Sequence, residues 1–194
     1  MVSNNYRITT IVNGRKADTL ADILPDKGKL NILMIAKTPA PVSVKAGHYF
    51  QGQQGKMLWN RLAEYGILKY PSGEFPDDYL LLNKIGITDI VKVPRDYGSE
   101  PSVQEYFDGM ERIISLITRF KPRIVFFVYK GVLDNILRLR YKISQKSKYG
   151  FNTQLETVFN SKVFVFPMPG TPCTKDESIK AMTDLQSIIQ SLYE

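Results

Sequence analysis

The stretch LNILMIAKTPAPVSVKAGHYFQGQQGKMLWNRL, residues 30–62, decides the fold. It starts with an apolar run, Ile32 to Ala36, that lacks the alternation of a half-exposed strand. This run predicts a strand buried on both faces of a parallel sheet. A loop broken by prolines, Lys37 to Pro41, follows directly. Because ligands of such sheets bind at the carboxyl ends of the strands, this loop is the first place to look for a functional site.

The rest of the chain alternates between further strands and helices. We expect strands at about residues 86–92, 123–129 and 162–166, and helices at about residues 57–65, 103–120, 131–140 and 175–192. Ser102 with Glu105, and Thr174 with Glu177, form capping boxes that begin two of these helices. The alternation predicts an α/β fold, a three-layer α/β/α sandwich with a central, mainly parallel sheet of about four strands.

Residues 1–29 carry the weakest pattern, and we expect them to form an N-terminal arm outside one domain of residues 30–194. Within the arm, Ala17 to Leu24 predicts a short helix that Pro25 ends. The arm either packs on the core or stays partly mobile, and we assign it no function.

Composition excludes several classes of protein. With 43% hydrophobic residues, 194 residues suffice for one domain with a sizeable core. The single cysteine, Cys173, excludes an internal disulfide and a cysteine set for zinc or an iron–sulfur cluster, so we expect no metal. Without a signal peptide or a membrane-length apolar run, the chain is expected to be intracellular, in the cytoplasm, with no membrane partner.

Common catalytic signatures are also absent. There is no phosphate-binding P-loop, no GxGxxG after the first strand and no GxSxG elbow. The one histidine, His48, favours a loop or partly buried hydrogen-bonding role over catalysis, although its place near the first strand-end loop keeps a catalytic role open.

Charge points to a polyanionic partner. A formal charge of +7 and a pI near 9.4 make nucleic acid the first partner to consider. The segment from Arg138 to Lys148 carries five basic residues and no acid. A nucleic-acid contact and an ordinary solvated loop are equally good interpretations of it.

Motifs in one order and spacing carry a resemblance to a known family. After the proline-containing loop come GHYFQGQQGKMLW (47–59), GITDIV (86–91), KPRIVFFVYKG (121–131) and VFPMPGTPC (165–173). The series resembles the uracil-DNA glycosylase superfamily, most closely its mismatch-specific uracil and thymine DNA glycosylase branch, over roughly residues 30–192. The resemblance implies an enzyme that flips a damaged or mismatched base out of DNA and hydrolyses its N-glycosidic bond without a metal or cofactor. Such a protein is expected to act on DNA as a monomer.

The resemblance also assigns roles near the first two motifs. The family's Gly-Ile-Asn-Pro-Gly corresponds to residues 36–40, so Thr38 stands where that branch keeps a water-positioning asparagine, and Ala36 is taken as base-binding. A threonine hydroxyl can orient water but is no general base at neutral pH. Ungapped counting from Trp59 puts Gln51 at the family's base-stacking position, and a one-residue shift puts Phe50 there. We favour Phe50 with Tyr49 as its neighbour; an aromatic residue that only closes the core is the other interpretation.

The last motif is similar to the family's Met-Pro-Ser-Ser-Ser loop, which approaches the DNA backbone. Here Pro169, Gly170 and Thr171 correspond to it, and Lys175 adds positive charge near a helix start. A plain strand-to-helix turn is the alternative interpretation.

Three polar residues of the family are changed. Val128 replaces an asparagine that reads the base edge, Lys56 replaces an asparagine before the tryptophan, and Asp89 replaces a neutral polar residue. Either the substrate differs, or the chain binds DNA without efficient cleavage. A lysine amine at Lys37 or Lys56 could also form a Schiff base with an abasic sugar, but a lysine near DNA more often contacts phosphate, and Lys56 is taken as DNA-binding. A nucleoside or nucleotide hydrolase is a further alternative.

Overall fold

The computed structural model describes residues 4–12, 14–96, 98–168 and 171–192. The strands are β1 (Arg7–Val12), β2 (Arg15–Leu20), β3 (Ile32–Ala36), β4 (Ile85–Asp89), β5 (Ile124–Phe127), β6 (Gly150–Phe151) and β7 (Lys162–Val165). The helices are α1 (Pro41–Ala46), α2 (Gln53–Glu64), α3 (Val103–Phe120), α4 (Lys130–Arg140), α5 (Glu156–Phe159) and α6 (Lys175–Gln190). Single 3-10 turns lie at Pro76–Tyr79, Leu81–Asn83 and Thr153–Leu155.

The central sheet has the strand order β4-β3-β5-β7-β6 in the described part of the chain. Neighbours among β4, β3, β5 and β7 pair in parallel, and β6 pairs antiparallel with β7. The predicted α/β fold with a mainly parallel sheet is confirmed. The sheet has five strands rather than about four, because β6 contributes only two residues, too few to show a periodic pattern in the sequence.

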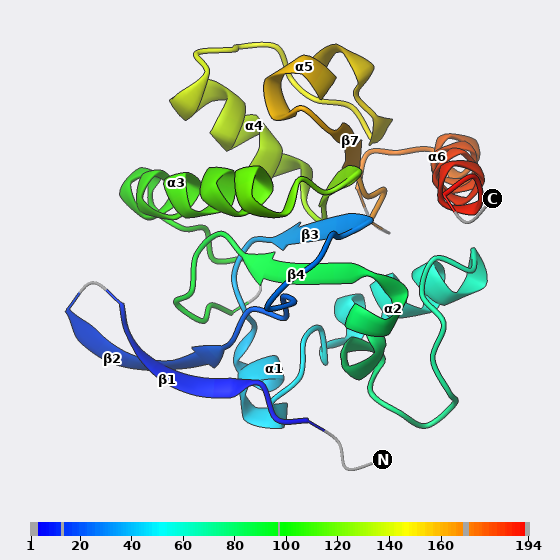
Figure 1. Cartoon of the computed structure of the whole chain (residues 1–194). Coiled ribbons are helices and arrows are strands. Elements are labelled where there is room, and N and C mark those ends of the chain that lie inside the picture. Colours follow the sequence, from blue (N-terminus) through cyan, green and yellow to red (C-terminus); the bar gives the residue numbers. More distant parts are fainter. Residues whose placement is uncertain (1–3, 13, 97, 169–170, 193–194) are drawn as a thin grey trace.

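Alternate residues of each strand face two separate apolar cores. Met34 and Phe126 belong to the core that α1, α2 and α6 cover, whereas Leu33 and Val125 belong to the core that α3, α4 and α5 cover. Figure 1 shows α3 and α4 on one side of the sheet and α1 and α2 on the other. All residues of β3 are buried, as expected for a strand covered on both faces.

The N-terminal segment is a β-hairpin, and the predicted helix at residues 17–24 is wrong. β1 and β2 pair antiparallel in the register Arg7↔Leu20. The β-branched residues of β1 favour an extended chain, and pairing with β1 overrides the weak helical pattern of β2. Leu20 and Ile23 are buried in the core beside α1 and α2, and Ile23 bridges Ile87 of β4. Of the two possibilities for the arm, the structure therefore shows packing on the core.

The helix ends follow the sequence signals where those signals are strong. Both capping boxes form: the Ser102 and Thr174 hydroxyls each accept the backbone N–H three residues later. The short helix α1 was not expected, but Pro41 occupies its first turn and Gly47, at φ 74°, ends it. Among the helices of the described residues, none is both long and apolar enough to cross a membrane.

Candidate active site

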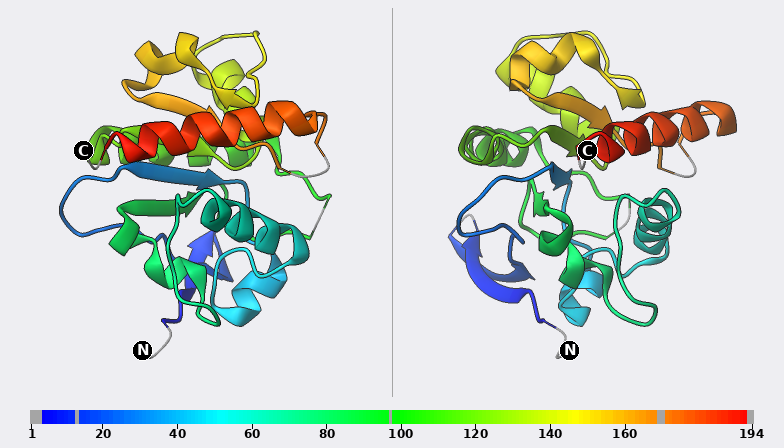
Figure 2. Two further views of the ribbon diagram at one scale, coloured as in Figure 1. Left: turned by 90° about the vertical axis from the view of Figure 1, so that its right-hand side faces the viewer. Right: turned by 45° about the vertical axis from the view of Figure 1, so that its right-hand side comes forward.

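The carboxyl ends of four parallel strands meet at one edge of the sheet. In the left view of Figure 2, the arrowheads of β3 and β4 point toward the end of the molecule where α6 begins. Pairing continues one residue beyond the strands: the Val128 N–H donates to the Ile35 carbonyl at 3.0 Å, and the Phe166 N–H donates to Phe127 at 2.9 Å. The first residues after these strands are therefore fixed side by side at what we call the carboxyl edge.

The predicted base-binding residues belong to one cluster. Ala36 and Val128 are fully buried in the core under α1, α2 and α6, and Met168 and Tyr49 are buried in the same core. Phe50 is half-buried and packs against this core. These side chains thus belong to one large apolar core, and Phe50 is the one among them that is not fully buried.

Phe50 has an unusual backbone that its neighbours hold in place. Its φ of 56° lies in the left-handed region that bulky side chains rarely adopt. On one side, the Tyr49 N–H donates to Asp77 at 2.7 Å, and the Tyr49 carbonyl accepts the Trp59 indole N–H at 3.1 Å. On the other, the Gln51 N–H donates to the Ser43 hydroxyl at 3.0 Å. Strain of this kind persists only where the surroundings determine it, and here they fix where the Phe50 ring lies.

Two further contacts define the Phe50 position. The ring meets the Trp59 ring edge-on, with centroids 5.5 Å apart. Behind it, Gly55 of α2 packs so tightly that an added Cβ would lie 2.4 Å from the Phe50 carbonyl oxygen. Glycine is therefore required at Gly55 for this loop and α2 to approach each other.

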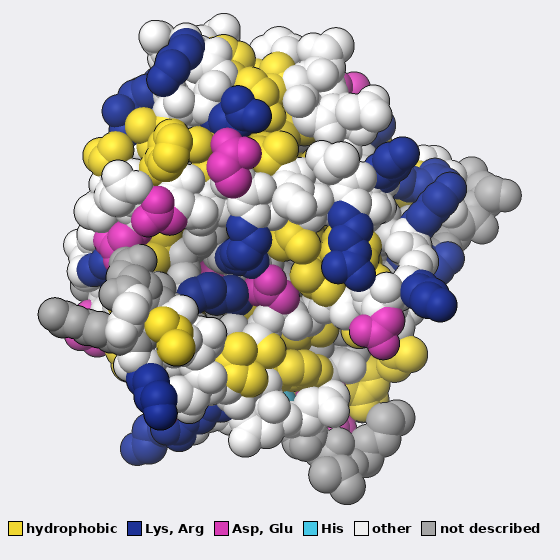
Figure 3. Space-filling view, turned by 60° about the vertical axis from the view of Figure 1, so that its left-hand side comes forward, with side chains coloured by type: hydrophobic (Ala, Val, Ile, Leu, Met, Phe, Trp, Pro, Cys, Tyr) yellow, Lys and Arg dark blue, Asp and Glu magenta, His cyan; other side chains and the backbone are white. Residues whose placement is uncertain are grey.

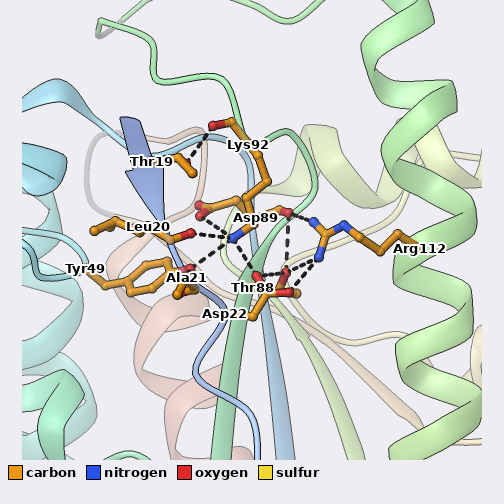
Figure 4. Close-up of polar contacts among 9 residues, drawn as sticks. All are labelled: Thr19, Leu20, Ala21, Asp22, Tyr49, Thr88, Asp89, Lys92 and Arg112. Carbon is orange, nitrogen blue, oxygen red and sulfur yellow. Dashed lines mark hydrogen bonds and ion pairs between the residues drawn. The ribbon is translucent and has the colours of Figure 1, made fainter. Parts of the chain in front are cut away.

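The Tyr49 hydroxyl lies in a buried polar network (Figure 4), while the Tyr49 ring lies 6.2 Å from the Phe50 ring, centre to centre. Its hydroxyl donates to the Ala21 carbonyl at 3.0 Å and accepts from the Lys92 amine at 3.3 Å. Burial, followed by the nearby charges of Asp89 and Asp22, raises the pKa of Tyr49 well above its ordinary value, so the phenol stays neutral. Its stacking role stays a prediction, and Phe50 is the more accessible of the two rings.

The same network joins the hairpin to β4 and α3. Lys92 contacts Asp22 at 2.5 Å and Asp89 at 3.4 Å, and Arg112 contacts Asp22 at 2.7 Å. Burial raises the pKa of Asp89 even though the Lys92 charge opposes that effect. Asp89 therefore belongs to a structural network beneath the carboxyl edge, which accounts for an acid at this position.

Thr38 and Lys37 follow β3 at the carboxyl edge. Thr38 is partly exposed, and its hydroxyl has no hydrogen-bond partner within the described part of the chain. The Lys37 amine lies 2.5 Å from a Glu100 carboxylate oxygen and 5.7 Å from the centre of the Tyr129 ring. The Thr38 hydroxyl is thus available to bind water, whereas the Lys37 amine is held in an ion pair.

The loop after β7 is the predicted DNA-contacting segment. The Thr171 hydroxyl donates to the Met168 carbonyl at 2.6 Å, and the Cys173 N–H donates to the Thr171 carbonyl at 2.7 Å. Pro169 and Gly170 lie outside the described residues. Lys175 is exposed in the first turn of α6, and Lys56 is exposed on α2.

Residues 24–175 match the family model described as the uracil DNA glycosylase superfamily. The match covers well over half of the chain and includes every strand-end loop of the carboxyl edge. The chain belongs to the uracil DNA glycosylase superfamily. The resemblance is therefore confirmed at the level of the superfamily, and the mismatch-specific branch stays a prediction.

A cavity of about 720 Å³ lies beside the candidate site of this superfamily member, between α2 and residues 68–76. Its lining includes Gln51, Lys56, Asn60, Tyr70 and Glu74, and Gln51 follows Phe50 directly in the chain. Aromatic, amide and charged groups are mixed along it, so its lining does not select a single ligand class.

His48 has a structural role in this superfamily member. It is buried, with Nδ1 3.0 Å from an Asp77 oxygen and its ring stacked on Phe75 at a centroid distance of 3.6 Å. Donor atoms of His48, Asp77 and Asp78 lie within 4.8 Å of one another, a set that could hold a metal ion. Burial raises the pKa of Asp77, and its hydrogen bonds from Tyr49 and His48 oppose that effect. These bonds join His48 and the backbone of Tyr49 to the same carboxylate, and so hold the segment directly before Phe50.

Sequence reasoning missed the residues that support Phe50. Ser43 belongs to the unexpected helix α1, and Asp77 lies in the 3-10 turn Pro76–Tyr79. Neither residue carries a motif, because each acts through a tertiary contact with the backbone of residues 49–51.

Proposed function

We propose that this chain is a DNA glycosylase that hydrolyses the N-glycosidic bond of a flipped, deaminated or mismatched base in DNA. The observation that carries the proposal is the superfamily match over residues 24–175. The positions of Ala36, Thr38 and Val128 at the carboxyl ends of β3 and β5 support it, because ligands of parallel sheets bind there.

The reaction needs few groups from the protein. The bond between the sugar C1′ and the base nitrogen breaks, its electron pair leaves with the base, and water adds to the cationic sugar carbon. The proton that this water loses is taken up by the released base anion, which leaves as the neutral base. In our proposal Phe50 stacks on the flipped base, and the Thr38 hydroxyl orients the water. The buried cluster of Ala36 and Val128 provides an apolar floor that excludes bulk water from the bond.

The apolar floor also bears on substrate choice. Val128 offers no hydrogen bond to a base edge, and Asp89 is engaged with Lys92. Selection would then depend on how easily a base leaves the helix, since a mismatched or damaged base costs least to flip. A guanine-paired uracil or thymine fits this requirement, in keeping with the predicted mismatch-specific branch.

DNA binding is assigned to groups around the same edge. Thr171, Lys175 and Lys56 would contact phosphates, with Pro169 and Gly170 of the loop after β7 approaching the backbone. Such contacts fix orientation without reading sequence. We propose that the protein acts as a monomer without a metal or cofactor.

The proposal is tested with labelled oligonucleotides that carry uracil or thymine opposite guanine, hypoxanthine or an alkylated base. After incubation with the protein, hot alkali cleaves the strand wherever a base has been released. A cut at one modified position supports the proposal and names the substrate. Intact strands across the panel, at protein in excess of DNA, contradict it.

A non-catalytic DNA-binding protein on the same fold is the second candidate. It is favoured by the surroundings of Thr38, whose hydroxyl makes no hydrogen bond to a carboxylate or imidazole within the described residues. This candidate predicts salt-sensitive DNA binding without an abasic product. A nucleoside or nucleotide hydrolase would be favoured only if DNA failed to bind at low salt.

A further inference from the structure

The basic segment before β6 lies at the same edge as the candidate site. In the antiparallel register of β6 and β7, Gly150 pairs with Val165, the last residue of β7. Residues before Gly150 therefore extend beyond the carboxyl end of β7. Lys146 and Lys148 come just before this pair, and the loop that the proposed function assigns to DNA comes just after Val165.

Two polar side chains with little or no exposure fix this segment. Asp134 of α4 accepts both the Ser147 N–H, at 2.8 Å, and the Ser147 hydroxyl, at 2.7 Å. Asn152, which is fully buried, accepts the Lys148 N–H at 2.9 Å and donates to the Lys148 carbonyl at 2.8 Å. The backbone from Ser147 to Lys148 is thus held on both sides, and little ordering would remain for a ligand to impose.

This arrangement presents the two lysines to solvent. Ser147 is buried between them, while Lys146 and Lys148 are exposed, with the Lys146 side chain 78% exposed. Asp134 pairs at 2.7 Å with Lys130, which begins α4 at the same edge, and lies only at the limit of contact with Lys146, at 4.0 Å. The Asp134 charge is therefore balanced by Lys130, and Lys146 and Lys148 leave a local surplus of positive charge.

The placement of these lysines differs from the general distribution of charge. On the face shown in Figure 3, basic side chains are spread widely, with acidic side chains between them. The overall charge of +7 therefore does not by itself define a DNA-binding face. Lys146 and Lys148, which are exposed on a backbone held by Asp134 and Asn152, are a specific local feature that could bind DNA.

We propose that residues 146–149 form a second DNA-backbone contact, in which the Lys146 and Lys148 amines bind phosphates on the far side of the loop after β7 from Lys175. The inference rests on the proposed function, because it takes DNA as the partner of the carboxyl edge. The DNA backbone would then cross this edge from the start of α6 to the segment before β6. Contacts of this kind add affinity but no sequence preference.

The test compares two double variants, Lys146→Ala/Lys148→Ala and the control Lys27→Ala/Lys29→Ala. The control removes the same charge from two exposed lysines just before β3, at the opposite edge of the sheet. Fluorescence anisotropy measures the Kd for a 20-base-pair duplex between 50 and 200 mM salt. Each lost phosphate contact lowers the slope of log Kd against log salt by about 0.9, so the first variant should lose about 1.8 and the control none. The weakening relative to the wild type then shrinks by about 12-fold across this salt range.

The outcomes separate the inference from the function on which it rests. If both double variants keep the wild-type slope while the wild type binds DNA, the second contact is refuted and the proposed function stands. If the wild type fails to bind DNA at 50 mM salt, both are refuted. Base release at saturating protein should match the wild type in the Lys27→Ala/Lys29→Ala control, because these lysines lie at the edge of the sheet opposite the candidate site. Urea unfolding of both variants verifies that the fold is retained.

Discussion

Replacing Gly55 with alanine should displace Phe50 and thereby impair base release. A Cβ at this position would lie 2.4 Å from the Phe50 carbonyl oxygen and 2.5 Å from the Phe50 Cβ, whereas ordinary contacts begin at 3.4 Å. The loop and α2 must therefore separate by about 1 Å at this point. Because the backbone at Phe50 is held by contacts on both sides, the separation moves the ring itself.

The two effects on stability oppose each other. Overpacking of this kind costs about 1–3 kcal/mol, and alanine in place of glycine inside a helix returns roughly 1 kcal/mol. The free energy of unfolding should therefore fall by about 0–2 kcal/mol, which leaves the protein folded. A misplacement near 1 Å can lower the rate of the chemical step about 10²-fold.

The assay is single-turnover base release on whichever oligonucleotide the wild type cleaves, with urea unfolding alongside. Gly131→Ala is the matched control, because Gly131 also lies in a helix and an added Cβ there would meet nothing within 4 Å. The control should retain the wild-type rate and lose no stability. If Gly55→Ala also released base at the wild-type rate while folded, Phe50 would not be the positioned stacking group.

Three further predictions address the chemistry and the fold. Thr38→Ala should lower the single-turnover rate of base release about 10²-fold while DNA affinity changes little, and equal losses in both would remove the water-orienting role of Thr38. Borohydride should trap no covalent adduct on an abasic oligonucleotide, because the proposed hydrolysis uses water and not a lysine amine; a trapped adduct detected by gel shift under denaturing conditions would contradict this. Burial acts to raise the pKa of Asp134, but hydrogen bonds from Lys130 and Ser147 outweigh it and hold the pKa below the ordinary value of 3.8. The Asp134 carboxylate therefore stabilises the fold above about pH 4, and this contribution is lost as pH falls through the lowered pKa. The free energy of unfolding, measured with urea, should then fall less from pH 5 to pH 2 in Asp134→Asn than in the wild type.

The sequence predicted the parts of the fold that carry a long periodic pattern. The buried run Ile32–Ala36 and the capping boxes of α3 and α6 each carry enough local signal to fix an element. The hairpin and β6 were not predicted, because strand pairing between distant or very short segments leaves little trace in local periodicity.

The same distinction holds for the candidate site: the residues placed by the strands could be predicted, and the residues placed by tertiary contacts could not. The places of Ala36 and Val128 could be predicted from the strands that they end or follow, since the carboxyl ends of parallel strands share one edge of the sheet. Phe50 could be placed only to within one residue by counting from Trp59, and the position of its half-buried ring depends on a left-handed backbone at φ 56°. Contacts from Ser43 and Asp77 hold that conformation, and such tertiary contacts cannot be read from the sequence.

The most direct test of the central claim is to measure free base released from DNA that contains a guanine-paired uracil or thymine. Mass spectrometry of the small-molecule fraction quantifies the base, and hot-alkali cleavage of the same sample quantifies abasic sites. The account predicts equal amounts of both, with Thr38→Ala strongly reducing the two together. DNA that is bound by the wild-type protein but yields neither free base nor alkali-labile sites would contradict the assignment of glycosylase chemistry to the carboxyl edge.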